Sequence, residues 1–156
     1  MSLTFDFPHA IDQVFAKLTN PQYLEARSKD LGELSATCTV QTEGNKTVVT
    51  MKRQVERSLP SFAQKLFNSV QVINLQEEWQ KSGDGYQGSY QIEIEGQPVS
   101  ISADFSLRVK GDGASYSITH HCKAKIPIIG KKIEKYIQGQ TEDGAREELN
   151  HALKSL

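Results

Sequence analysis

Apolar and polar residues alternate along most of the chain between Leu34 and Ile126. From Val99 to Val109, for example, every second residue is apolar and the residues between them are polar. This period of two is typical of strands with one face in the core and the other in water. The breaks EGNK, SGDG, EGQP and KGDG contain residues that favour tight turns. With the alternating LTFDF near the N-terminus, the pattern predicts an antiparallel sheet of about seven strands.

Helical spacing interrupts this alternation in shorter segments. The segment His9–Leu18 has apolar residues three and four positions apart, which predicts a short amphipathic helix. A second short helix is expected to begin at Asn20 and Pro21, an N-cap followed by proline at the first helical position. The connection Ser58–Phe67 is too long for a tight turn, and it predicts a short helix or a lid after Pro60.

The longest helix is expected at the C-terminus, where Ile129, Ile133 and Ile137 share one helical face. A sheet with one apolar face must bury that face against another element. Only the C-terminal helix is long enough to cover it, so the sheet is expected to curve around this helix. The predicted fold is therefore α+β, a single domain of residues 1–156 in which two short helices follow the first strand.

The composition is typical of a soluble domain, with 156 residues, 37% of them hydrophobic and 24% charged, and a net charge of −1. This balance argues against a nucleic-acid-binding protein, which usually has a basic excess. The chain has no apolar run long enough to span a membrane, and its N-terminus lacks the features of a signal peptide. Cys38 and Cys122 are far apart, which argues against a zinc site or a disulfide framework. We therefore expect a cytoplasmic protein with free thiols.

Four motifs resemble those of a known superfamily. They are FDFPHAIDQVF at Phe5–Phe15, RSLPSF at Arg57–Phe62, EEW at Glu77–Trp79 and, most specifically, IPIIGKKIE at Ile126–Glu134. With the order of the expected elements, they resemble the helix-grip fold of the SRPBCC superfamily, which includes polyketide cyclases, START proteins and the birch-pollen allergen. Within it, the chain is similar to a bacterial family of unknown function. The resemblance implies a cavity between a curved sheet and a long helix, which other members use for lipids, sterols, polyketides and other apolar molecules.

Several polar side chains are expected on the inner, apolar face of the sheet. Counting by twos from the apolar positions places charged or titratable side chains there, together with two tyrosines. Burial of an unpaired charge costs several kcal/mol, so such groups must be paired or near water. They are interpreted either as structural ion pairs and strand-end residues, or as the polar anchors of a mostly apolar pocket. The candidate ligand-binding residues are Arg53, Glu77, Trp79, Tyr90, Tyr116 and His120.

The inner face also contains many small residues, and Gly144 and Ala145 lie opposite them in the C-terminal helix. Small residues on both surfaces either let helix and sheet approach closely or leave volume unfilled. The superfamily resemblance favours a cavity. On the strands, the small residues are Ala36, Cys38, Gly88, Ala103, Ala114 and Ala124.

The entrance to this cavity is expected between the Ser58–Phe67 segment and the start of the C-terminal helix. Lys131 and Lys132 lie at this helix start, where the helix dipole disfavours cations. They are interpreted either as a solvated surface or as a patch that attracts an anionic headgroup or membrane surface. The candidate entrance residues are Pro60, Phe62, Ile129 and Gly130.

Motifs for other chemistry do not fit their context. GDGYQG at Gly83–Gly88 matches a dinucleotide-binding pattern, but strand-like sequence follows it where that site needs a helix. His120 and Cys122 share a strand face, yet two ligands do not make a zinc site. No metal ion or cofactor is therefore expected.

Three functions are consistent with the sequence. The first is binding of an apolar small molecule or lipid in the cavity. The second is an enzyme of cyclase or hydratase type, in which Glu77 or His120 would move protons and burial would raise the carboxyl pKa. The third is a protein-interaction module that holds no ligand.

Overall fold

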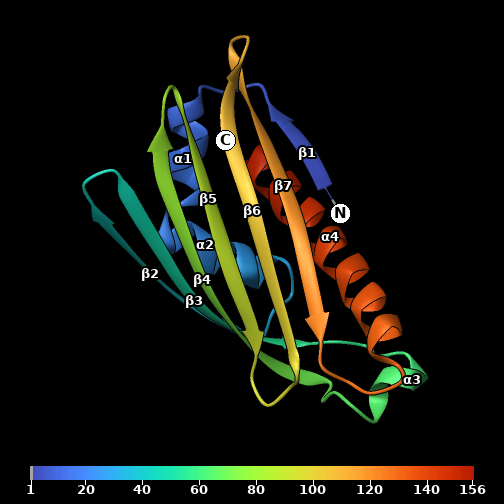
Figure 1. Cartoon of the computed structure of the whole chain (residues 1–156). Coiled ribbons are helices and arrows are strands. Elements are labelled where there is room, and N and C mark those ends of the chain that lie inside the picture. The colour runs from blue at the N-terminus through green and yellow to red at the C-terminus, as the bar shows by residue number, and fades with distance from the viewer. Residues whose placement is uncertain (1) are drawn as a thin grey trace.

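The computed structural model describes residues 2–156 as one curved sheet with four helices (Figure 1). The long helix α4 runs along the concave face and contacts β7 and β1, while α2 lies against β2. The elements are β1 (Ser2–Phe7), α1 (Ile11–Leu18), α2 (Pro21–Asp30), β2 (Ser35–Glu43), β3 (Lys46–Glu56), α3 (Ser61–Gln64), β4 (Val70–Ser82), β5 (Gly85–Ile94), β6 (Val99–Lys110), β7 (Gly113–Ala124) and α4 (Gly130–Ser155).

The seven strands form one antiparallel sheet in the order β1-β7-β6-β5-β4-β3-β2. In each predicted turn a glycine has a positive φ, with values of 61°, 62°, 73° and 58° at Gly44, Gly83, Gly96 and Gly111. Residues with a side chain rarely adopt this conformation, which explains the glycines. The GDGYQG segment lies in the β4–β5 turn and leads into a strand. The predicted antiparallel sheet is confirmed.

The core lies between the concave face of the sheet and α4. The buried residues of α4 include Ile133 and Ile137, four residues apart, and Leu149 and Ala152, three residues apart, as expected of a helix with one side in the core. The inward side chains of the sheet pack against this side of α4. The apolar faces of the sheet and of the helix thus bury each other. The predicted helix-grip architecture is confirmed.

The short helices form where the sequence predicts them. The Asn20 side chain accepts a hydrogen bond from the Tyr23 backbone N–H at 2.9 Å, as expected of an N-cap. Tyr23 also connects α2 to α4, because its hydroxyl group lies 2.7 Å from His151 Nδ1. The connection after Pro60 contains only the single helical turn of α3.

Two residues expected on the inner face are instead exposed. Leu34 has 52% of its surface exposed and Val109 has 45%. Leu34 precedes β2, and Val109 is the second-last residue of β6, so both lie at the end of a strand. Alternation predicts the direction of a side chain, but not whether another element covers it.

Candidate functional site

A cavity of about 290 Å³ lies between the concave face of the sheet and helices α2 and α4. Its volume is close to the lower limit of about 300 Å³ that is usual for small-molecule sites. The sheet contributes a mainly apolar wall made of Val49, Met51, Val55, Ile73, Leu75, Trp79, Ile92, Ile94, Ile101 and Ile118.

The sheet register brings predicted site residues together on this wall. Glu77 lies opposite Tyr90, Tyr90 opposite Ala103, and Ala103 opposite His120, so they form one row across four strands. Ala103 is small and leaves space between the tyrosine and the histidine. Their role in ligand binding stays a prediction, but the structure places all of the candidates on the cavity wall: Arg53, Glu77, Trp79, Tyr90, Tyr116 and His120.

The carboxyl group of Glu77 lies on the cavity wall next to the indole of Trp79. The Trp79 Nε1–H group donates a hydrogen bond to Glu77 Oε2 at 2.8 Å. Burial raises the pKa of Glu77 from 4.5 to about 7, although this hydrogen bond and the charge of Arg27 both lower it. Near neutral pH the carboxyl group can therefore donate or accept a proton.

Tyr90, Tyr116 and His120 add uncharged polar groups to the wall. Burial raises the pKa of both tyrosines, and nearby acids raise it further, so both hydroxyl groups stay protonated. Burial lowers the pKa of His120, which leaves its imidazole mainly neutral at pH 7. The rings of Tyr90 and His120 are 5.9 Å apart. These groups can hydrogen-bond a ligand without adding charge to the cavity.

An ion-pair network joins the helices to β3 on one side of the cavity. Arg27 of α2 lies 2.6 Å from Glu148 of α4, and Arg53 lies 3.2 Å from Glu33 and 4.0 Å from Glu148. Burial alone would raise the pKa of Glu148, but the arginines outweigh it and the pKa is lowered. Arg53 thus pairs with Glu33 and Glu148 and not with Glu77.

Four half-buried charged residues of the wall do not stand out in the sequence. Three of these residues lie in helices or in a turn, where the alternation of inward and outward side chains does not apply. Arg57 is different, because it continues the alternation of Arg53 and Val55 just beyond the end of β3. Continuing the alternation of β3 by two residues therefore predicts that Arg57 also faces inward. The four residues are Arg27, Glu33, Arg57 and Glu148.

Two glycines on the inner surfaces have different surroundings, and the absence of a side chain has a different effect at each. A Cβ atom on Gly88 of β5 would collide with the backbone oxygen of Glu78 and the ring of Phe105. Gly88 therefore permits close packing. Gly144 of α4 lies on the cavity wall, and a Cβ atom there would meet no atom within 4 Å. Gly144 therefore leaves volume open.

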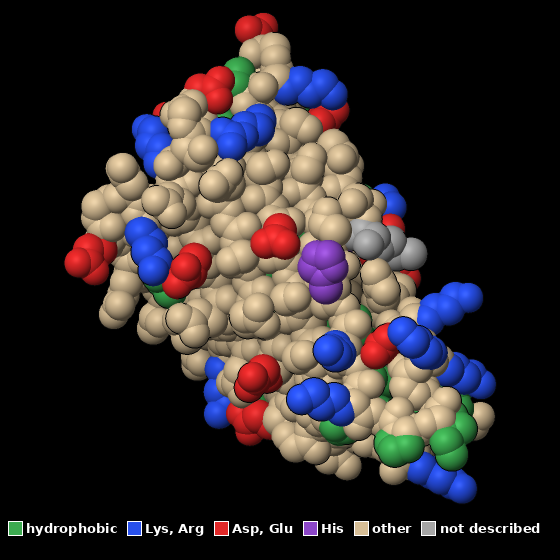
Figure 2. Space-filling model, in the orientation of Figure 1, with side chains coloured by type: hydrophobic (Ala, Val, Ile, Leu, Met, Phe, Trp, Pro, Cys, Tyr) green, Lys and Arg blue, Asp and Glu red, His purple; other side chains and the backbone are tan. Residues whose placement is uncertain are grey.

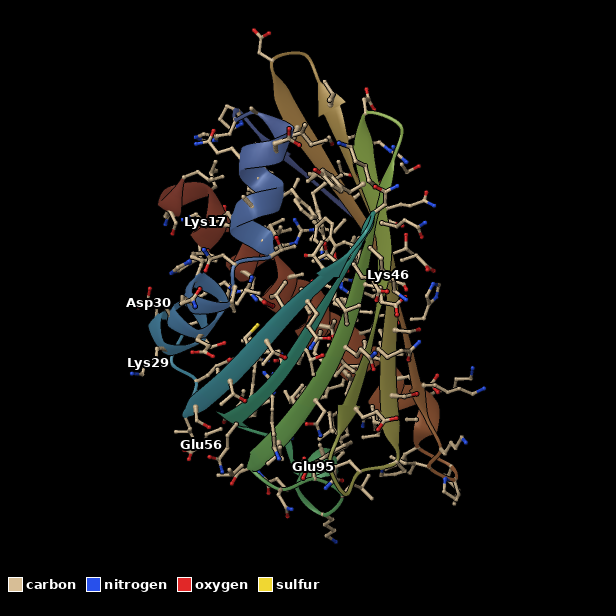
Figure 3. All side chains as sticks on the ribbon, turned by 90° about the vertical axis from the view of Figure 1, so that its left-hand side faces the viewer. Lys17, Lys29, Asp30, Lys46, Glu56 and Glu95 are labelled. Atoms are coloured by element: carbon tan, nitrogen blue, oxygen red, sulfur yellow. The ribbon has the colours of Figure 1, made fainter. Side chains whose placement is uncertain are left out.

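The exposed residues of the wall mark where the cavity meets solvent. Figure 3 shows this side of the molecule, with Lys29 and Asp30 at the end of α2 and Glu56 at the end of β3. The exposed wall residues lie after α2, at the end of β3 and along α4: Leu31, Gly32, Glu56, Gln140 and Glu147. The cavity mouth therefore lies between α4 and the edge of the sheet that carries β2 and β3.

The predicted entrance residues lie outside this wall. None of Pro60, Phe62, Ile129 and Gly130, all in the described part of the chain, lines the cavity. Phe62 is one layer further out, because it packs against Tyr136, which lines the cavity; the two ring centres are 5.7 Å apart and the rings are nearly perpendicular. The α3 segment is thus attached to α4 beside the cavity, and its role as an entrance stays a prediction.

Lysine side chains gather around exposed apolar ones where β7 leads into α4 (Figure 2). Ile128 is fully exposed, and its φ of 69° is rare for a β-branched residue. Lys125, Lys131 and Lys132 are exposed next to it, and Lys132 Nζ lies 4.4 Å from the centre of the Phe62 ring. We call Lys125, Ile128, Lys131 and Lys132 the basic tip. No helix within residues 2–156 is long and apolar enough to cross a membrane.

The cysteines and histidines are not arranged for metal binding or nucleophilic catalysis. Within residues 2–156, no three His, Cys, Asp or Glu side chains are close enough to hold a metal ion. Cys38 on β2 and Cys122 on β7 are free thiols on well-separated strands. Burial raises the pKa of both thiols to about 11, so they are protonated and weakly nucleophilic at neutral pH.

Comparison with known proteins agrees with this architecture. A family model described as "Protein of unknown function (DUF2505)" matches residues 2–155. A search of curated proteins finds no matching sequence.

Several solved structures share the fold. The protein TTHA0849 from Thermus thermophilus is 13% identical, with a TM-score of 0.65 over 99% of this chain and 94% of that one. A START superfamily protein from Mycobacterium smegmatis is 12% identical, with a TM-score of 0.62 over 99% and 97% of the two chains. Ara h 8.0201 is 13% identical, with a TM-score of 0.56 over 99% and 97%. These identities show the fold alone, and they confirm the expected START-like architecture.

Proposed function

This chain belongs to the DUF2505 family of proteins of unknown function, and we propose that it binds a small apolar molecule or lipid between the sheet and α4. The observation that carries the proposal is the cavity of about 290 Å³. Protein interiors are normally packed without voids larger than a water molecule. A mainly apolar cavity with a few convergent polar groups is typical of a small-molecule site.

The distribution of small residues supports the same proposal. Gly144 is a helical residue facing the cavity, and the space beside it would accommodate a side chain. A glycine inside a helix lowers stability by about 1 kcal/mol relative to alanine. Helix packing does not require it here, whereas a ligand in the cavity would.

A matched pair of variants tests this proposal. Gly144→Leu fills the cavity, while Gly139→Leu adds the same side chain to α4 at a position outside the wall that also has no atom within 4 Å. Dodecanol binding would be followed by calorimetry and by the fluorescence of Trp79, which lines the cavity and is the single tryptophan. We expect saturable binding that Gly144→Leu weakens at least about tenfold and Gly139→Leu leaves unchanged. Absence of binding, or equal effects of both variants, would contradict the proposal.

We further propose that the basic tip contacts an anionic membrane surface. The supporting observation is an exposed isoleucine in a strained backbone conformation among exposed lysines. Each lysine near an anionic surface adds about 1 kcal/mol of attraction. This contact would bring the protein to a source of apolar ligand.

Vesicle sedimentation tests the contact. We expect binding to vesicles with a quarter phosphatidylserine and none to pure phosphatidylcholine. Lys131→Glu with Lys132→Glu should abolish it, while the control Lys17→Glu with Lys29→Glu changes the charge equally on α1 and α2. Unchanged binding of the first double variant would refute the membrane contact.

A further inference from the structure

Arg57 differs from the other arginines of the cavity wall. Arg27 and Arg53 form ion pairs with Glu148 and Glu33. The Arg57 side chain forms no ion pair or hydrogen bond with any residue in 2–156, although it lines the cavity and is partly buried. Its backbone N–H donates to the Ser69 carbonyl at 2.7 Å, which holds the residue where β3 ends beside β4. The backbone of this arginine is therefore fixed, while its guanidinium has no carboxylate of residues 2–156 within 4 Å, and Glu33 and Glu148 act on it only from a greater distance.

The surroundings of Arg57 disfavour a positive charge. Burial and the neighbouring charge of Arg53 lower its pKa, and the more distant Glu33 and Glu148 offset this only in part, yet a guanidinium stays protonated in proteins. A partly buried, unpaired charge lowers stability, and an anion at this place would remove that penalty.

We propose that the ligand of the cavity is an amphipathic anion, with one negatively charged end group held by Arg57 and an apolar chain along the sheet. This inference rests on the proposed function. A guanidinium has a planar set of donors that matches a carboxylate or phosphate with two parallel hydrogen bonds. A cationic end group at this place would instead meet the like charges of Arg57 and the neighbouring Arg53.

The charge distribution also gives the ligand a direction. Arg57 adjoins Glu56, an exposed residue at the cavity mouth, so the anionic end lies near solvent. Further along the sheet, the ionised form of Glu77 in the middle of β4 would repel a second negative charge. Trp79 is buried and packs against the rings of Phe15 and Phe105. The chain of the ligand therefore points toward Trp79, and its end group stays at the mouth.

Ligands of equal chain length test this inference. Dodecanoate, dodecyl phosphate, dodecanol and dodecyltrimethylammonium would be titrated below their micelle concentrations, with calorimetry and Trp79 fluorescence as readouts. We expect the two anions to bind at least about tenfold more tightly than dodecanol, as hydrogen bonds to charged groups allow. Tighter binding of dodecanoate would indicate a free carboxylate ligand, and tighter binding of dodecyl phosphate a phosphate headgroup.

Variants separate recognition by Arg57 from a general effect on the fold. Arg57→Gln should remove the preference for anions and leave dodecanol binding unchanged, and Arg57→Lys should keep part of the preference. Arg146→Gln is the control, because Arg146 is an exposed arginine of α4 outside the cavity wall. Equal affinity of the wild type for dodecanoate and dodecanol would overturn the inference while leaving the proposed function intact. If Arg57→Gln lost the binding of both dodecanoate and dodecanol, the inference would also be overturned. If the wild type bound none of the four ligands, the inference and the proposed function would both be overturned.

Discussion

Glu77 provides a quantitative test of the cavity's electrostatics. Replacing it with glutamine removes the ionisable group and keeps an oxygen that accepts the Trp79 hydrogen bond. The neighbouring residue Glu78 is the matched control. It lies on the outer face of β4, where it pairs with Lys46 at 3.2 Å with about half of its side chain exposed.

The magnitude follows from the raised pKa of Glu77. Each unit of pKa corresponds to about 1.4 kcal/mol, so a rise from 4.5 to about 7 corresponds to about 3 kcal/mol of unfolding free energy. Because the cavity opens to solvent, this figure is an upper limit. Below pH 4.5 the group is protonated in both states, and the difference from glutamine is small. As the pH rises to 7 the unfolded chain ionises first, so the wild type loses stability relative to Glu77→Gln.

The assay is urea unfolding followed by Trp79 fluorescence at several pH values between 4.5 and 8. Glu77→Gln should become more stable than the wild type by up to about 3 kcal/mol at pH 8, with most of the gain appearing between pH 5 and 7. Glu78→Gln should differ from the wild type by less than about 1 kcal/mol throughout, as exposed ion pairs usually do. A pH-independent difference for Glu77→Gln, or the same curve for both variants, would refute the assignment of a raised pKa to Glu77.

Three further predictions concern packing, strain and thiol chemistry. Gly144→Ala should stabilise the protein by about 1 kcal/mol in urea unfolding, whereas Gly88→Ala should destabilise it, because only the second Cβ atom meets other atoms. Equal changes in unfolding free energy for the two variants would contradict the open volume beside Gly144 in α4. Ile128→Asn should raise the unfolding free energy by about 1 kcal/mol by relieving the left-handed backbone, and should also weaken vesicle binding. A loss of stability would show that Ile128 makes contacts that outweigh the strain. Cys38 and Cys122 should react with a disulfide reagent at pH 8 roughly 100-fold more slowly in the folded protein than in urea, since burial raises both pKa values to about 11. Fast reaction of the folded protein would contradict that burial.

The alternation of the strands predicted much of the cavity wall. It placed Glu77, Tyr90 and His120 on the inner face, because the direction of a strand side chain depends only on its position along that strand. It did not predict which row they share, since the row depends on the pairing of strands distant in sequence.

What surrounds each polar group was decided by contacts between different elements. Arg53 pairs with Glu33 and Glu148, which come from a turn and from α4. Neither lies on a strand, so alternation carries no information about them. For the same reason alternation did not predict the exposed part of the cavity wall, because that part lies where α2, β3 and α4 meet.

The sequence by itself therefore determined the curved sheet, the helix it wraps around and the direction of the inward side chains, because these follow from local periodicity and from the need to bury one apolar face. Only the tertiary structure decided that Gly88 serves close packing while Gly144 borders open space, and that Arg57 lacks the partner its neighbours have. Free volume and charge pairing depend on the distances between elements, and those distances result from how the whole chain packs.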